Sequence, residues 1–311
     1  LVNSVVAPSS NAGNNSGNLT DSGSAGSNGA LNLSVDGSQV TLLGYDAPES
    51  LANVAATMSS ANHRSIGYAD ASGTFTVGPR LTDAYSGSNN NARAAVSVDG
   101  STFWTGGNPG VRYVGTNAAA ATTSTALITS SPPNTRFVTI ASDRDDKRFL
   151  VGNSAATVFV WPTATLPTTA SVQQVLSIPG LPSDLGEVVM LDRSATFAAP
   201  NLGGMDTIYV TNGQGSTSGS IAKFEWNGTT WNSRSSRTYT NGLNGLAARV
   251  TDSGDIQLFV TTRLSSGNNQ LLTRTDTSAF GSDISLGSFT VLATSGTGYG
   301  FRGISFTPDE A

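Results

Sequence analysis

The chain repeats one short unit along its length: an apolar strand, a turn built on Asp or Gly, a second apolar strand, and then Gly or Asn. The clearest copy is residues 94–107, and residues 31–44 and 247–260 follow the same pattern. Repeats of roughly 40–50 residues that are made of strands are typical of a β-propeller. The repetition therefore predicts an all-β fold, although it identifies no reaction.

The repeat divides the chain into two parts and several blades. We interpret residues 1–30 as an N-terminal strand and a polar loop rich in Gly, Ser and Asn, and residues 31–311 as the propeller domain. Each blade is expected to contain about four strands. The predicted blades are residues 28–87, 89–131, 134–180, 183–240 and 241–295.

The two ends of the chain supply the last predicted blade. Strands expected at residues 1–7 and 301–306 would combine, because propellers commonly unite their termini in one blade and so remove exposed sheet edges. We therefore predict a six-bladed propeller closed by its termini, with seven blades as the alternative. This last blade would lack strands. They either precede Leu1 in a longer chain or come from another chain by strand addition.

Composition limits the classes of function. Charged residues make up 12% of the chain and the net charge is −5, which disfavours nucleic acid as a partner because phosphate binding needs a basic surface. The absence of cysteine excludes disulfides, thiolate metal sites and a cysteine nucleophile. No apolar run reaches the ~18–20 residues of a membrane-spanning helix. These features favour a secreted or cell-surface protein, more typical of bacteria.

Three strings carry a resemblance to a known family: DGSTFWTGGNPGVRYV at 99–114, GMDTIYVTN at 204–212 and FRGISFTP at 301–308. The chain resembles a largely uncharacterised family of secreted bacterial proteins with similar strings, over most of residues 31–308. The resemblance implies a propeller and an extracytoplasmic location. It implies no established activity and no catalytic residues. In that family further strands usually precede the segment that matches residues 1–8.

Arginines begin several of the predicted inner strands. They are Arg93, Arg136 and Arg302, with Arg64 as a further candidate. The innermost strands of a propeller line its central channel, so these guanidinium groups could converge at one mouth and bind a carboxylate or phosphate. The alternative interpretation is that each one hydrogen-bonds carbonyl groups of a neighbouring blade.

One hairpin is the best candidate for contact with a partner. Trp226 and Trp231 flank an Asn-Gly turn, which predicts a tight hairpin with both rings exposed near an edge. Aromatic rings beside polar groups suit the apolar faces and hydroxyl rims of sugars. The other large aromatics are weaker candidates for stacking on a sugar, because most of them lie within predicted strands, where packing between blades is the commoner explanation. They are Trp104, Trp161, Tyr113, Tyr209 and Tyr299.

Candidates for catalysis or metal binding are weaker. His63 is the only histidine and no G-x-S-x-G motif is present, so we interpret His63 as a loop-packing residue. An acid–base pair would come from Asp83, Asp143, Glu187 and Asp192. We expect no cofactor, although calcium is possible at two acidic turns, where Asp and Gly also serve the turn itself. Those calcium candidates are Asp143, Asp145, Asp252 and Asp255.

Three functions remain open at this point. The first is a non-catalytic extracellular or cell-surface interaction module that binds a protein or glycan partner or assembles with copies of itself by strand addition. The second is a lectin-like propeller that binds carbohydrate through Trp226 and Trp231. The third is a propeller enzyme that cleaves a polysaccharide or an ester. Nucleic acid is not expected as a partner, nor is a membrane span.

Overall fold

The computed structural model describes residues 4–10, 12–23, 25–115, 121–128, 134–163, 165–214, 216–263, 268–285 and 287–309. These residues form an all-β structure with a single 3₁₀ turn, η1 (Val54–Ala56). Contacts divide the chain into two compact units. The first consists of Leu1–Ile140, Pro167–Val172 and Ser305–Ala311, and the second of Ala141–Leu166 and Gln173–Ile304. No helix in the described part of the chain is long and apolar enough to cross a membrane.

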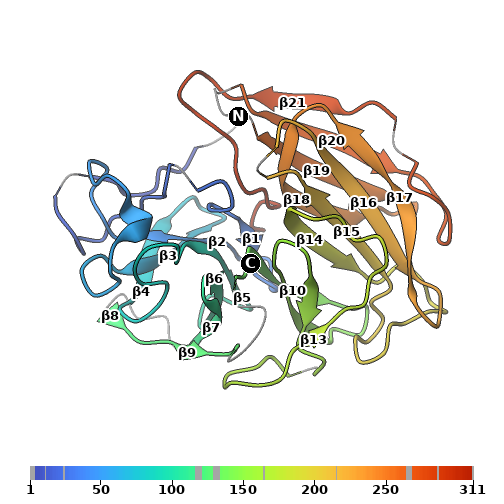
Figure 1. Ribbon diagram of the computed structural model, residues 1–311, viewed down its shortest axis with the longest axis horizontal. Coiled ribbons are helices and arrows are strands. Elements are labelled where there is room, and N and C mark those ends of the chain that lie inside the picture. The colour runs from blue at the N-terminus through green and yellow to red at the C-terminus, as the bar shows by residue number, and fades with distance from the viewer. Residues whose placement is uncertain are drawn as a thin grey trace. The chain divides into compact units, whose positions relative to one another are not determined.

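The strands form five successive sheets (Figure 1). The first contains β1 (Asn32–Leu33), β2 (Gln39–Tyr45), β3 (Arg64–Asp70) and β4 (Phe75–Leu81), with β8 (Ala121–Thr122) added in parallel to β4. The second contains β5 (Ala92–Ser97), β6 (Phe103–Gly107), β7 (Gly110–Val114) and β9 (Thr125–Ala126). The third contains β10 (Phe137–Ser142), β11 (Arg148–Asn153), β12 (Val158–Val160) and β13 (Gln174–Val175).

The fourth and fifth sheets belong to the second unit and carry the longest strands. The fourth contains β14 (Leu185–Leu191), β15 (Thr207–Asn212), β16 (Gly219–Trp226) and β17 (Trp231–Tyr239). The fifth contains β18 (Gly242–Val250), β19 (Ile256–Arg263), β20 (Gln270–Asp276) and β21 (Thr290–Thr294). Neighbouring strands in these two sheets are antiparallel and consecutive in the chain, which is the order of strands within a propeller blade.

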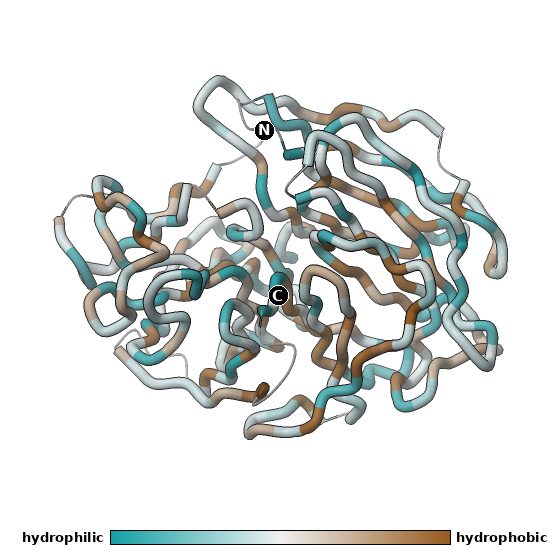
Figure 2. Tube along the Cα trace, viewed as in Figure 1, coloured by the Kyte–Doolittle hydropathy of each residue, from teal (hydrophilic) through white to brown (hydrophobic). Residues whose placement is uncertain are grey.

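Alternation of apolar residues explains why these segments form strands. In β19, Ile256, Leu258 and Val260 are buried while Gln257 and Phe259 are less so, which is the period of two that a strand imposes. These three aliphatic side chains belong to a core cluster of the second unit. Hydrophobic residues accordingly concentrate on the strands, and the connections between them are more hydrophilic (Figure 2).

The prediction of six or seven blades is wrong. The described residues form a five-bladed β-propeller, one sheet for each of the five blades expected between residues 28 and 295. Residues 301–309 form no strand, and neither do residues 4–7. Residues 1–3 of the expected N-terminal strand lie outside the described residues.

The close packing of residues 302–304 against the fifth sheet explains this error. The Arg302 carbonyl accepts a hydrogen bond from Thr261 Oγ1. A Cβ on Gly245 would lie 2.6 Å from that carbonyl oxygen, so only glycine permits the approach. A threonine of the fourth sheet makes the same kind of bond to the first strand of the fifth sheet: Thr211 Oγ1 in β15 donates to the Asn244 carbonyl in β18 at 2.8 Å. The apolar pattern of the C-terminal segment therefore reflects packing on a blade, not a blade of its own.

Candidate functional site

Two pockets border on the connection between β14 and β15 in the second unit. The first, here called the charged pocket, has a volume of about 260 Å³. Its polar lining consists of Arg144, Asp145, Lys147, Asp192, Ser194 and Thr196. The second, the tryptophan pocket, has a volume of about 210 Å³. It is defined by Trp226, Trp231, Gln174, Ser177, Thr229 and Thr230.

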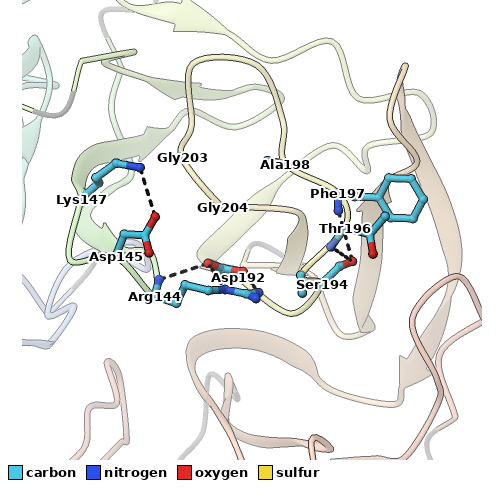
Figure 3. A pocket seen from close by; sticks show the side chains of 11 residues that line it. Arg144, Asp145, Lys147, Asp192, Ser194, Thr196, Phe197, Ala198, Gly203 and Gly204 are labelled. Atoms are coloured by element: carbon cyan, nitrogen blue, oxygen red, sulfur yellow. Dashed lines mark hydrogen bonds and ion pairs between the residues drawn. The ribbon is translucent and has the colours of Figure 1, made fainter.

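Ion pairs form one side of the charged pocket (Figure 3). Arg144 Nε donates to Asp192 Oδ2 at 2.8 Å and Arg144 Nη2 donates to Asp192 Oδ1, so the pair is bidentate. The Asp192 side chain is only 4% exposed, whereas that of Arg144 is 45% exposed. Lys147 and Asp145 form a second pair at 3.2 Å, and both are well exposed to solvent. The pocket thus combines one anchored ion pair with one mobile surface pair.

Asp143 precedes the ion-paired residues of the charged pocket and stabilises the turn 143–147 that carries them. Its Oδ1 accepts the amide hydrogens of Asp145 and Lys147, each at 2.9 Å, and its Oδ2 accepts that of Gly204 at 3.0 Å. Burial by itself raises the pKa of Asp143, but these amide hydrogen bonds outweigh it and hold the pKa below its ordinary value. Asp143 is therefore a carboxylate committed to backbone donors.

Gly204 lets the Asp192 carboxylate lie directly against the chain. A Cβ at this position would overlap the Asp192 carboxylate, which Arg144 holds in place. We expect Gly204→Ala to displace that carboxylate and to lower the free energy of unfolding by about 1–3 kcal/mol, as overpacking usually does. Equilibrium urea unfolding measures this loss. Gly23→Ala is the matched control, since a Cβ there meets nothing within 4 Å. Equal stability of the two variants would contradict the account.

A buried carboxylate anchors the start of the connection between β14 and β15. Asp206 has no solvent exposure, and its oxygens accept the amide hydrogen of Arg193 at 3.1 Å and that of Ser194 at 2.5 Å. Burial raises the pKa of Asp206 to about 6, although hydrogen bonds from Thr207, Ser194 and Arg193 oppose the rise. Beyond it, Ser194 Oγ accepts the amide hydrogen of Thr196 at 3.0 Å and so shapes the rim of the charged pocket.

The side chain of Arg193 ties the same segment to a buried ion network. Glu225 is at its centre: Glu225 Oε1 lies 3.1 Å from Arg193 Nη1 and 3.0 Å from Lys223 Nζ, and Glu225 Oε2 lies 3.2 Å from Arg234 Nε. Lys223 also lies 3.4 Å from Asp276 Oδ2. Lys223, Glu225 and Asp276 have no side-chain exposure. The network fixes the loop that forms the rim of the charged pocket.

The β16–β17 hairpin builds the tryptophan pocket. Trp226 and Trp231 are cross-strand partners whose rings pack edge to face, with centroids 5.8 Å apart. Asn227 Oδ1 accepts the amide hydrogens of Thr229 and Thr230 at 3.0 and 2.9 Å, which holds the hairpin tip. The expectation that both rings are exposed is wrong for Trp231, which is 3% exposed. Trp226 is half-buried, so it is the more accessible ring of the pair.

The arginines predicted to line a channel mouth have different environments. Arg93 is 6% exposed and its Nη1 donates to the Thr135 carbonyl at 2.7 Å, and burial together with the charge of Arg136 lowers its pKa to about 10. Arg64 is also buried, and its Nε donates to the Tyr85 carbonyl at 2.9 Å. Arg93 therefore hydrogen-bonds a carbonyl of the next predicted blade, as the alternative interpretation expects, whereas the partner of Arg64 lies within its own predicted blade, residues 28–87. Arg136 in the first unit and Arg302 in the second are half-buried.

The remaining sequence candidates are dispersed. Asp83 pairs with Arg112 at 2.9 Å, and buried Glu187 accepts the Leu246 amide hydrogen at 2.8 Å. His63 is half-buried, with a pKa lowered first by burial and then by the charge of Arg80. Of the calcium candidates outside this pocket, Asp252 is exposed and Asp255 accepts a hydrogen bond from Ser253 at 2.9 Å. Within the described residues, no three His, Cys, Asp or Glu side chains form a group that could hold a metal ion.

The structure brings two of the candidate acids together, Asp143 and Asp192, on either side of Gly203 and Gly204. Sequence reasoning missed the two glycines and Arg144. The available signals were the charged turn 143–147 in a chain with few charges, and the Gly-Gly pair just before Asp206. Both carboxylates accept hydrogen bonds from the protein, Asp143 from backbone amides and Asp192 from Arg144.

Comparison with known proteins adds structural likenesses only. No family model matches the chain, and no curated protein matches it. The periplasmic gluconolactonase of Pseudomonas aeruginosa is similar with a TM-score of 0.47 and 13% identity, covering 84% of this chain and 71% of that one. A putative 6-phosphogluconolactonase from Bacteroides fragilis gives 0.46 and 13%, covering 90% and 74%. An exo-β-1,3-galactanase from Phanerochaete chrysosporium gives 0.44 and 13%, covering 94% of this chain and 55% of that one. None of these likenesses carries an argument about function.

Proposed function

We propose that this protein is a non-catalytic carbohydrate-binding propeller and that a sugar ring binds in the tryptophan pocket. The observation that carries the proposal is the half-buried ring of Trp226, held by the buried Trp231 within a pocket of about 210 Å³. A sugar presents an apolar C–H face that stacks on an aromatic ring.

The polar lining of the pocket supports the same ligand. Ser177 offers a hydroxyl group and Gln174 an amide. Thr229 and Thr230 offer hydroxyl oxygens as acceptors, because their hydroxyl groups donate to Asn227 Oδ1 and to the Trp231 carbonyl. Leu202 and Pro200 complete an apolar wall. A pocket that combines an apolar wall with hydroxyl and amide groups suits a ring with an apolar face and a hydroxyl rim.

The carboxylates of the second unit support binding without catalysis. Glycoside cleavage by the usual route needs a carboxylic acid with a raised pKa that can reach the substrate. Asp192 is engaged by Arg144, and hydrogen bonds hold the pKa of Asp143 below its ordinary value. Burial raises the pKa of Asp206 and Glu187, but their side chains are held by backbone amides and line neither pocket. A secreted location and self-assembly by strand addition stay predictions from the sequence.

Trp226→Ala is expected to weaken glycan binding about 30-fold, since loss of an aromatic anchor at the centre of a binding site costs about 2 kcal/mol. An array of neutral and acidic oligosaccharides identifies the ligand, and isothermal titration then compares wild type with the variant. Tyr299→Ala is the control, because Tyr299 is 77% exposed and does not line the pocket. An array without any bound glycan, or full affinity in Trp226→Ala, would refute the proposal.

A further inference from the structure

The charged pocket and the tryptophan pocket share one wall. Along the connection between β14 and β15, Ala198 and Gly203 line the charged pocket, while their neighbours Ala199 and Leu202 line the tryptophan pocket. A single stretch of backbone, residues 198–203, therefore separates the two cavities.

Phe197 links the two pockets at a second point. It lines the charged pocket, and its ring stacks on Phe280 with centroids 5.6 Å apart. The same ring lies 3.5 Å from the position that a Cβ would take on Gly228, at the tip of the hairpin that carries Trp226. The hairpin of one pocket is thus in contact with a lining residue of the other.

The charged pocket offers groups suited to a neutral polyol. Its two cations, Arg144 and Lys147, each face a carboxylate, so the formal charges cancel. Asp192 occupies Nε and Nη2 of Arg144, whereas Nη1 of this partly exposed side chain has no hydrogen-bond partner among the described residues and can donate to a ligand. The exposed Asp145 provides an acceptor next to these donors. Donors and acceptors placed side by side, without net charge, match vicinal hydroxyl groups better than an anion.

We propose that the two pockets are subsites of one groove that binds a neutral oligosaccharide across residues 198–203. This inference rests on the proposed function, since it requires that a sugar occupies the tryptophan pocket. A second sugar unit of the same chain would then reach Arg144 and Lys147 in the charged pocket. Affinity depends on chain length, because the second subsite adds contacts to a ligand already held at the first.

The test compares the monosaccharide with the tetrasaccharide of the neutral glycan that the array identifies, by isothermal titration. Wild type is expected to bind the tetrasaccharide at least about tenfold more tightly than the monosaccharide, and Arg144→Gln to remove that gain while monosaccharide affinity is unchanged. Lys147→Gln repeats the test on an exposed side chain whose loss spares the fold. Arg249→Gln, an exposed arginine hydrogen-bonded to Gln257, is the matched control.

The outcomes separate the two proposals. Loss of the length-dependent gain in both pocket variants, with wild-type behaviour in Arg249→Gln, supports the groove. Equal affinities of wild type for the two ligands, or a full gain in both pocket variants, overturn the groove and leave the tryptophan pocket intact. An absence of binding by either ligand to wild type overturns the proposed function itself.

Because the formal charges cancel, tetrasaccharide affinity should also change less than about twofold between 50 and 500 mM salt.

Discussion

Glu225→Gln is expected to lower the free energy of unfolding by about 3–5 kcal/mol, the usual cost of removing one partner from a buried ion network. The Glu225 carboxylate faces three cations, Lys223, Arg193 and Arg234. Glutamine keeps the shape but removes the charge, so Asp276 alone remains to balance them. The desolvation cost of Lys223, which has no side-chain exposure, is then left largely uncompensated.

Urea unfolding of wild type and Glu225→Gln at one pH measures the loss. The matched control is Asp145→Asn, because Asp145 forms an ion pair with Lys147 on the surface, where such pairs contribute about 0–1 kcal/mol. A loss below about 1 kcal/mol in Glu225→Gln would contradict a tightly coupled network. The same variant is expected to loosen the 193–198 segment, since Arg193 loses its charged partner and keeps only hydrogen bonds to the Gly254 and Ser278 carbonyls.

Stability is expected to fall as the pH rises from about 4 to 6. The folded-state pKa of Asp206 is about 6, above its ordinary value of 3.8. The protonated Asp206 carboxyl contributes to the free energy of unfolding. This contribution is fully present below about pH 3.8 and is lost as the pH rises through about 6. The difference corresponds to about 3 kcal/mol, at about 1.36 kcal/mol per pH unit. Burial of Glu187 raises its pKa and acts in the same direction.

Other carboxylates oppose this trend only at lower pH. Asp143 and Asp276 have pKa values below 3.8, so their contribution is present above that value and lost as the pH falls below it. Maximum stability is therefore expected near pH 4. Unfolding free energies measured from about pH 3 to 8 check this, and Asp206→Asn should reduce the slope between about pH 4 and 6. A slope of zero in wild type, or the same slope in the variant, would count against the assignment.

Local patterns predicted most of the fold. The five blade regions and the β16–β17 hairpin follow from alternating apolar residues and from Asp or Gly at turns, which depend on neighbours in sequence. The prediction of a sixth blade is wrong because the apolar pattern does not show whether a segment pairs as a strand, and residues 302–304 instead lie against the fifth sheet without forming a strand.

The site depended more on contacts between distant residues. The tryptophan hairpin is local, so sequence found it, although the mutual packing that buries Trp231 was not visible. The charged pocket joins the Asp143 turn to Gly204, 61 residues apart, and such a contact leaves no local signal. In the sequence, Lys223 and Glu225 look like two polar residues on one face of a strand. Their partner Asp276 lies in another sheet, so the sequence pattern does not reveal the ion network.

Indole N–H resonances test the central claim most directly. The chain has four tryptophans, so a protein labelled with ¹⁵N should give four indole cross-peaks, which single substitutions assign. Titration with the glycan found on the array is expected to shift the peaks of Trp226 and Trp231, and to leave those of the buried Trp104 and Trp161 in place. Binding that leaves the Trp226 peak unmoved would contradict the assignment of the tryptophan pocket as the carbohydrate site.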